Sequence, residues 1–181
     1  PPAGQLGSTA IHKDSSAFVA WAMACTVQRG PQNISEPALG LASVGVQANV
    51  VGMPTSNVLS LGDGGTATLT FTQPITNGPG WDFAVFENGY SDTFLELAFV
   101  EVSSNGTDYI RFAATSNTPT DTQVDGFGVV DATLIDNLAG KYRAHYGTPF
   151  DLDALANEPG LDINAITHVR IVDVVGCIQD A

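Results

Sequence analysis

The sequence predicts a mainly β protein, a β-sandwich or jelly roll with one short N-terminal helix. Three observations support this class: short apolar segments recur at hairpin spacing, Gly-rich turns separate them, and only one segment has helical spacing. A chain of 181 residues is long enough to bury a core as one domain. We therefore expect residues 1–181 to form a single β-sandwich domain.

The helix is expected after Asp14 or Ser15, because either side chain can cap a first turn. The residues that follow have the i, i+3, i+4, i+7 spacing of an apolar helical stripe, namely Phe18, Trp21, Ala22 and Cys25. The β-branched pair at 26–27 and the Gly-Pro pair at 30–31 end the predicted helix.

Strand patterns follow along the rest of the chain. Residues 58–61 predict a short strand, the Gly-rich residues 62–65 a hairpin turn, and the alternating residues 66–71 the return strand. Asn105-Gly106 predicts a second hairpin, with residues 109–112 as the partner strand. Residues 166–175 predict a closing strand.

The central stretch, residues 78–104, has two apolar arms joined by a polar turn at residues 87–93. Both faces of each arm are apolar, which is typical of strands at the centre of a packed sheet or sandwich. Acidic residues interrupt this pattern at Asp82, Glu87, Glu96 and Glu101. A buried carboxylate stays ionised only when it is paired, and the chain has only six Lys and Arg in total.

The net charge of -13 excludes partners that need clustered basic residues, such as nucleic acid or an anionic membrane surface. No apolar run approaches the roughly 20 residues of a membrane span. The excess of carboxylates indicates a solvated acidic surface, calcium binding, or both. Low Lys content and many Thr, Ser, Gly and Asn residues indicate an extracellular protein.

The two cysteines, Cys25 and Cys177, lie near opposite ends of the chain. In an oxidising compartment they would close a long loop and stabilise the fold by about 4 kcal/mol. The alternative is two buried free thiols. We favour the disulfide.

Six segments follow one another along the chain: LGDGGTATLTF, DFAVFEN, FLELAFVEVSSNG, NLAGKY, GTPFDLDAL and VRIVDVVG. Together and in this order they resemble a group of secreted bacterial cell-surface proteins. The resemblance covers the chain from Gln5 onward and implies a calcium-associated β-sandwich displayed outside the cell. Similar proteins continue past the position of Gly176 into another Asp-containing strand, whereas this sequence stops at Ala181. Either the domain is complete without that strand, or an open slot accepts one from a neighbouring subunit.

Two acidic clusters are candidate calcium ligands, because calcium takes six to eight oxygen ligands. The first cluster is the polar turn with the residue that follows it, namely Glu87, Asn88, Asp92 and Glu96. The second is Asp151 and Asp153, which lie on one side of an extended segment. The alternative is that Asn88 and Asp92 serve the turn and Asp151 caps a helix.

Four aromatic residues beside turns are candidates for stacking on a sugar ring, namely Trp81, Tyr90, Tyr142 and Tyr146. The alternative for Trp81 is packing at a strand end. Catalysis has less support. Glu96 and Glu101 fall on opposite faces of one strand, while Glu87 and Glu96 could meet across a hairpin. The three histidines lack zinc-site spacing, and no nucleophile-elbow motif is present.

These observations favour a non-catalytic, extracellular, calcium-stabilised surface subunit of a filament, a lattice or an adhesin-like assembly. Its expected partner is another copy of itself or a second surface protein. The alternative is a carbohydrate-binding module with a glycan as ligand. A glycan-active enzyme is the third hypothesis.

Overall fold

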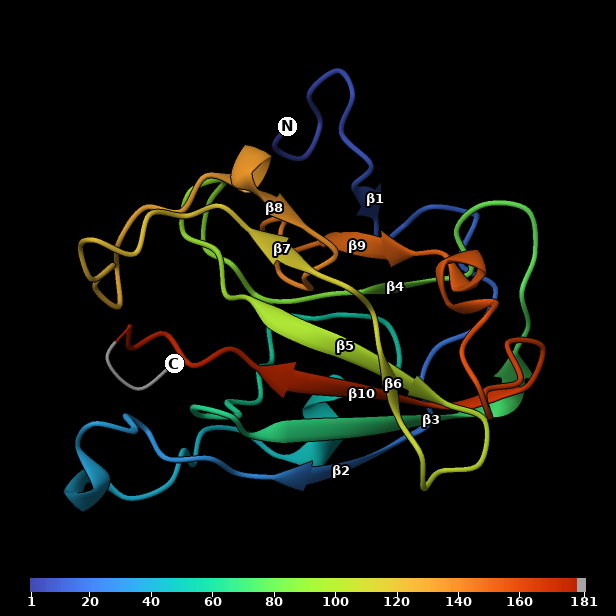
Figure 1. Cartoon of the computed structure of the whole chain (residues 1–181), viewed down its shortest axis with the longest axis horizontal. Coiled ribbons are helices and arrows are strands. Elements are labelled where there is room, and N and C mark those ends of the chain that lie inside the picture. Colours follow the sequence, from blue (N-terminus) through green and yellow to red (C-terminus); the bar gives the residue numbers. More distant parts are fainter. Residues whose placement is uncertain (179–181) are drawn as a thin grey trace.

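Antiparallel sheets make up the regular structure of residues 1–178, the part of the chain that the computed structural model describes (Figure 1). The largest sheet has five strands in the order β2-β3-β10-β5-β6. A second sheet has the order β1-β9-β4, and β7 pairs with β8. The predicted mainly β class is confirmed.

The strands of the five-stranded sheet are β2 (Ala24–Gln28), β3 (Thr66–Ile75), β10 (Ile166–Asp173), β5 (Ala98–Ser103) and β6 (Ile110–Arg111). The three-stranded sheet contains β1 (Ile11–His12), β9 (Tyr146–Phe150) and β4 (Phe83–Val85). The small pair is β7 (Thr115–Ser116) and β8 (Ile135–Asp136). The helical segments of the described chain are single 3-10 turns: η1 (Pro37–Leu39), η2 (Gln47–Val50), η3 (Ala132–Leu134) and η4 (Leu152–Leu155).

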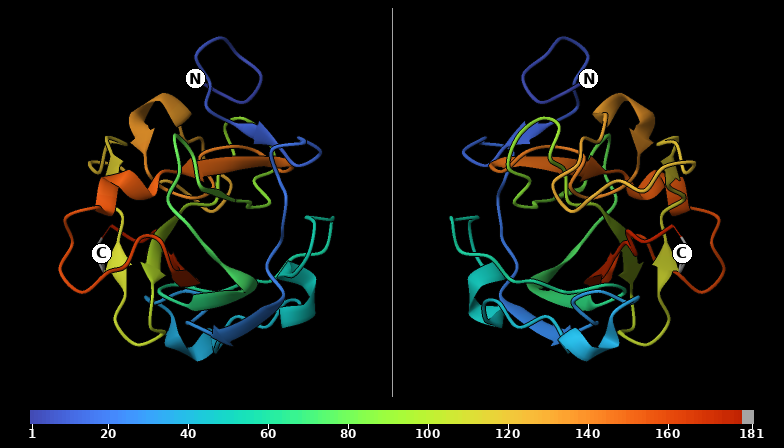
Figure 2. Two further views of the ribbon diagram at one scale, coloured as in Figure 1. Left: turned by 90° about the vertical axis from the view of Figure 1, so that its right-hand side faces the viewer. Right: turned by 90° about the vertical axis from the view of Figure 1, so that its left-hand side faces the viewer.

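The main core lies between the two larger sheets, which face each other in Figure 2. Alternation along the strands places Val100 and Val102 of β5 and Val169 and Ile171 of β10 on the inner face, where they are buried. From the opposite sheet, Phe150 of β9 is buried against them. The apolar strand pattern is therefore satisfied by packing between layers.

The outer face of the five-stranded sheet holds a charge network around the buried Glu101. Register places Arg170 of β10 opposite Glu101 of β5, and Glu101 opposite Arg111 of β6. Each arginine Nε donates to a different carboxylate oxygen of Glu101, at 2.6 Å from Arg170 and 2.8 Å from Arg111. Glu101 therefore obtains the pairing that a buried carboxylate requires.

The predicted N-terminal helix is wrong. Ala24–Gln28 instead forms β2, which pairs with β3 along its whole length. In β2 the alternating Cys25 and Val27 face the core while their neighbours are exposed. Upstream, the Phe18 and Trp21 rings pack against Phe86, with ring centroids 5.4 and 5.7 Å from that of Phe86. Tertiary contacts thus use these apolar residues without a helix, which the i, i+4 spacing alone did not reveal.

The arms of residues 78–104 do not form a hairpin. The first arm supplies β4, which pairs with β9 in the three-stranded sheet. The second supplies β5, which pairs with β10 and β6 in the five-stranded sheet. The polar turn between them therefore carries the chain from one sheet to the other.

The other strand predictions have mixed outcomes. The turn before β3, the hairpin between β5 and β6, and the closing strand β10 are confirmed. Residues 58–61 are not a strand. Their backbone is held by two backbone hydrogen bonds, from Ser60 N–H to Val44 and from Gly30 N–H to Leu61, and by the side chains of Arg29 and Asn49. These residues lack a partner strand in the described chain.

The structure does not join the two cysteines. The Sγ of Cys25 donates to the carbonyl of Thr26 at 3.6 Å, and the Sγ of Cys177 lies 3.1 Å from the Oγ of Ser35. Register explains the separation, because Cys25 lies level with Leu69 and Val169, well before Cys177 along β10 and the segment that follows it. A disulfide needs the two Cα atoms within about 7 Å.

Candidate functional site

A cavity of about 1300 Å³ lies between the two larger sheets. Its walls include Leu69 of β3, Ile171 of β10 and Val85 of β4, so both sheets contribute. Residues 58–61, the segment that was predicted as a strand but pairs with none, also line it. The cavity is mostly apolar, as binding sites generally are.

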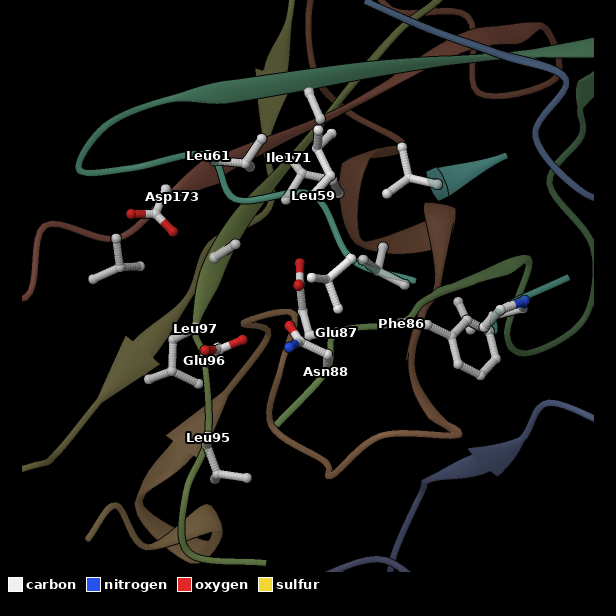
Figure 3. A pocket seen from close by; sticks show the side chains of 18 of the residues that line it. Leu59, Leu61, Phe86, Glu87, Asn88, Leu95, Glu96, Leu97, Ile171 and Asp173 are labelled. Atoms are coloured by element: carbon white, nitrogen blue, oxygen red, sulfur yellow. The ribbon is translucent and has the colours of Figure 1, made fainter. Parts of the chain in front are cut away.

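Three of the carboxylates that line this cavity come from three different segments, as Figure 3 shows for Glu87, Glu96 and Asp173. These are the three cavity carboxylates. Each continues the inward alternation of a strand. Glu87 follows Phe83 and Val85 of β4, Glu96 precedes Ala98 of β5, and Asp173 follows Val169 and Ile171 of β10. Because β5 and β10 are antiparallel, with Asp173 opposite Ala98, Glu96 and Asp173 lie at the same end of the five-stranded sheet. Glu87 approaches them from the three-stranded sheet (Figure 3).

Backbone contacts hold Glu87 and Glu96 in place. Ala98 and Ala139 exchange two hydrogen bonds, of 3.1 and 2.9 Å, which bring Gly140 against Glu96. A Cβ at Gly140 would lie 1.7 Å from the carbonyl oxygen of Glu96 and 3.3 Å from Cγ of Glu87. Gly140 also has a φ of 77°, which favours glycine. This position therefore requires glycine so that the two acidic segments can approach.

The three cavity carboxylates have no basic partner within residues 1–178. All six Lys and Arg lie in that range and are engaged elsewhere. Arg111 and Arg170 bind Glu101 and Arg143 binds Asp92. The other three contact Asp14, Asp136 and backbone carbonyls, through Lys13, Lys141 and Arg29 respectively.

Burial and mutual repulsion make these carboxyls weak acids. Burial, with added repulsion from Glu96 and Asp173, raises the pKa of Glu87 from 4.5 to about 8. Burial, with repulsion from Asp63 and Glu96, raises the pKa of Asp173 from 3.8 to about 7. Burial also raises the pKa of Glu96. Near neutral pH the cluster therefore holds protons that exposed carboxylates would release.

The other sequence-predicted metal ligands have protein partners. Asp92 forms an ion pair with Arg143. Asp151 caps η4 by accepting from the Asp153 N–H at 2.9 Å, as in the alternative that the sequence left open. Asp153 accepts from Nδ2 of Asn77 at 2.8 Å. Residues 1–178 contain no group of three or more His, Cys, Asp or Glu side chains placed to hold a metal ion.

The four predicted sugar-stacking residues are dispersed. Tyr142 is buried, and its hydroxyl lies 2.9 Å from Oγ1 of Thr9, so no ring face is open to a sugar. Tyr146 packs edge-on against His12 and lies under the Arg143 guanidinium. Trp81 is about half exposed and lines the cavity. Tyr90 is exposed and forms a small cleft of about 260 Å³ with Phe94 and Phe127.

Sequence reasoning found Glu87 and Glu96 but missed Asp173 as a site residue. The signal was present, because Asp173 interrupts an apolar strand at an inward position, as Glu87 does. Only the pairing of β10 between β3 and β5 brings it to the other two carboxylates. Asn88, the remaining predicted ligand, lines the same cavity (Figure 3).

No protein-family model, curated protein or solved structure matches the chain. Residues 1–178 contain no helix with the length and hydropathy to cross a membrane.

Proposed function

We propose that the two facing sheets are an incomplete β-sandwich, and that this protein is a non-catalytic extracellular surface subunit that assembles by accepting a strand. The observation that carries the proposal is the apolar cavity between the sheets, bordered by β4. In the described chain β4 pairs only with β9, so its other edge is open. An open apolar edge is a template for strand addition.

The walls of the cavity support this reading on both sides. β4 offers unpaired backbone groups, and residues 58–61 have the sequence of a strand but no partner strand in the described chain. Exposed apolar cavities of this size cost stability, since the lining side chains lose contact partners. A strand inserted here would pair with β4 and cover both walls.

Hydrogen exchange tests this proposal. The probe is a capped peptide of alternating valine and threonine, which has one apolar face and no charge. We expect it to raise the melting temperature and to slow amide exchange in residues 83–86, while exchange in edge strand β2 stays unchanged. Unchanged exchange in residues 83–86 at saturating peptide would contradict strand acceptance.

Calcium remains a prediction from the sequence for the cavity carboxylates. Among the six predicted ligands, Glu87, Asn88 and Glu96 line the cavity, and Asp173 lines it as well. Metal analysis and chelation test this prediction, and their outcome is independent of strand acceptance.

Carbohydrate binding is a second candidate, favoured by the exposed cleft of Tyr90, Phe94 and Phe127. The Phe94 and Phe127 rings are stacked with centroids 5.7 Å apart, next to the exposed face of Tyr90. Glycan titration against the protein and a Tyr90→Ala variant tests it, and binding must be lost in the variant. Hydrolysis of the same glycans, absent in Glu87→Gln, would instead support the glycan-active enzyme.

A further inference from the structure

We propose that the strand accepted by the cavity carries one Lys or Arg on its inward face, which pairs with Glu87, Glu96 and Asp173. The inference rests on the proposed function, because it names the chemistry of the strand that fills the same cavity. Its basis is charge complementarity: Glu87, Glu96 and Asp173 face a mostly apolar cavity, and no Lys or Arg of residues 1–178 forms an ion pair with them.

The position of the carboxylates sets where the basic residue must lie. Glu87 follows β4 by two residues on the inward-facing side, so a strand paired with β4 would pass directly beside it. Asp173 ends the inward face of β10 on the opposite wall. A single inward side chain near one end of the strand would therefore lie between carboxylates of both sheets.

The surroundings of the carboxylates favour a basic side chain over a metal ion. Leu59, Leu61, Leu97 and Ile171 lie around them (Figure 3). The aliphatic stem of Lys or Arg packs along such walls while its charged end reaches the acids. Calcium needs six to eight converging oxygens, and residues 1–178 contain no group of three or more His, Cys, Asp or Glu side chains placed to hold a metal ion.

We infer that residues 1–178 of a second copy do not supply the partner strand, which comes from another polypeptide. All six Lys and Arg of this chain lie in residues 1–178, where each already contacts an acid or a carbonyl. Donating one of them to a neighbour would break an existing interaction, such as the Glu101 network. This favours a second surface protein over another copy of this chain as the partner.

Calorimetric titration with three capped nine-residue peptides tests the inference. All alternate valine on one face with threonine on the other. One has lysine at the seventh, valine-face position, one has norleucine there, and one has lysine at the sixth, threonine-face position. The two lysine peptides differ mainly in the face that bears the charge. We expect the valine-face lysine peptide to bind at least about tenfold more tightly than either of the others.

The double variant Glu87→Gln/Asp173→Asn should remove this preference and leave norleucine-peptide binding unchanged. Glu158→Gln, an exposed acid outside the cavity, serves as the control variant and should keep the preference. The comparison of peptides on the unmodified protein decides the question even where the double variant does not fold. Equal binding of the valine-face lysine and norleucine peptides would overturn the inference but leave strand acceptance intact.

Two further outcomes separate the alternatives. Failure of all three peptides to bind would overturn strand acceptance itself. A fourth peptide, with glutamate at the seventh position, is titrated with calcium and with EDTA. Tight binding of this peptide in calcium alone would show that the carboxylates hold a metal, and would overturn the proposal of a basic side chain.

Discussion

At the scale of single residues, Glu87 connects the cavity to the stability of the fold. Its pKa is about 8 in the folded protein and near 4.5 when the chain is unfolded. Between these values the unfolded chain has released its proton and the folded chain has not, so stability falls as the pH rises. Asp173, with a pKa of about 7, acts in the same direction. We expect the melting temperature to decrease from pH 5 to pH 8.

Glu87→Gln should flatten this dependence, because glutamine mimics the protonated acid at every pH. At pH 8 we expect the variant to be more stable than the unmodified protein by at least about 1 kcal/mol, or about 2–4 °C in melting temperature. Near pH 4 the two should coincide. Glu158→Gln is the matched control, and thermal melts across the pH range are the measurement. Parallel curves for Glu87→Gln and the unmodified protein would contradict the assignment.

For Glu101 we expect the opposite effect of substitution by glutamine, a loss of stability, because this buried carboxylate is paired with two arginines. Glu101→Gln would leave Arg111 and Arg170 without their shared anion, and we expect a loss of about 1–3 kcal/mol in unfolding free energy. Asp14→Asn, which weakens only the contacts of the exposed Asp14 carboxylate with Lys13 and His12, should cost less than about 0.5 kcal/mol. Denaturant titration compares the two, and equal losses would refute a special role for the Glu101 network.

At the scale of elements, the contact of Gly140 with the acidic segments is open to direct test. Gly140→Ala combines an unfavourable positive φ with a clash against the Glu96 backbone. Gly160→Ala shares the positive φ of 82° but has open space around its added Cβ. We expect about 1–2 kcal/mol of destabilisation at Gly160 and about 1–3 kcal/mol more at Gly140, by denaturant titration. Similar losses at both positions would mean that this contact is unimportant.

The sequence predicted individual strands and local hairpins better than it predicted which distant strands pair. The sequence correctly predicted the closing strand β10 and the hairpin from β5 to β6, because both depend on local order. It could not show that β4 and β5 belong to different sheets, since β4 pairs with β9 more than sixty residues away. For the same reason the sequence did not indicate that Asp173 lies beside Glu87 and Glu96. The helical spacing around Phe18 and Trp21 arose instead from packing on Phe86.

At the scale of the whole molecule, the cavity carboxylates can be stabilised by a calcium ion or by a basic side chain of an accepted strand, and the two cases differ in their response to EDTA. A structural calcium at one hundred times its dissociation constant would add about 2.7 kcal/mol, and EDTA would remove it. Because we propose a basic side chain as the partner of these carboxylates, we expect EDTA to leave the melting temperature unchanged and purified protein to contain no calcium. A drop that calcium restores would support the sequence-based calcium prediction instead.

The place of β10 has a consequence for how the chain reaches its fold. This strand lies between β3 and β5, in the middle of the largest sheet, yet it begins only at residue 166. Until the ribosome has synthesised that segment, β3 lacks one neighbour and β5 lacks its main one. Pairings between such distant segments form slowly, because long loops must close first. Nascent chains should therefore remain without a complete sheet until residues 166–173 have left the ribosome, and so stay accessible to chaperones.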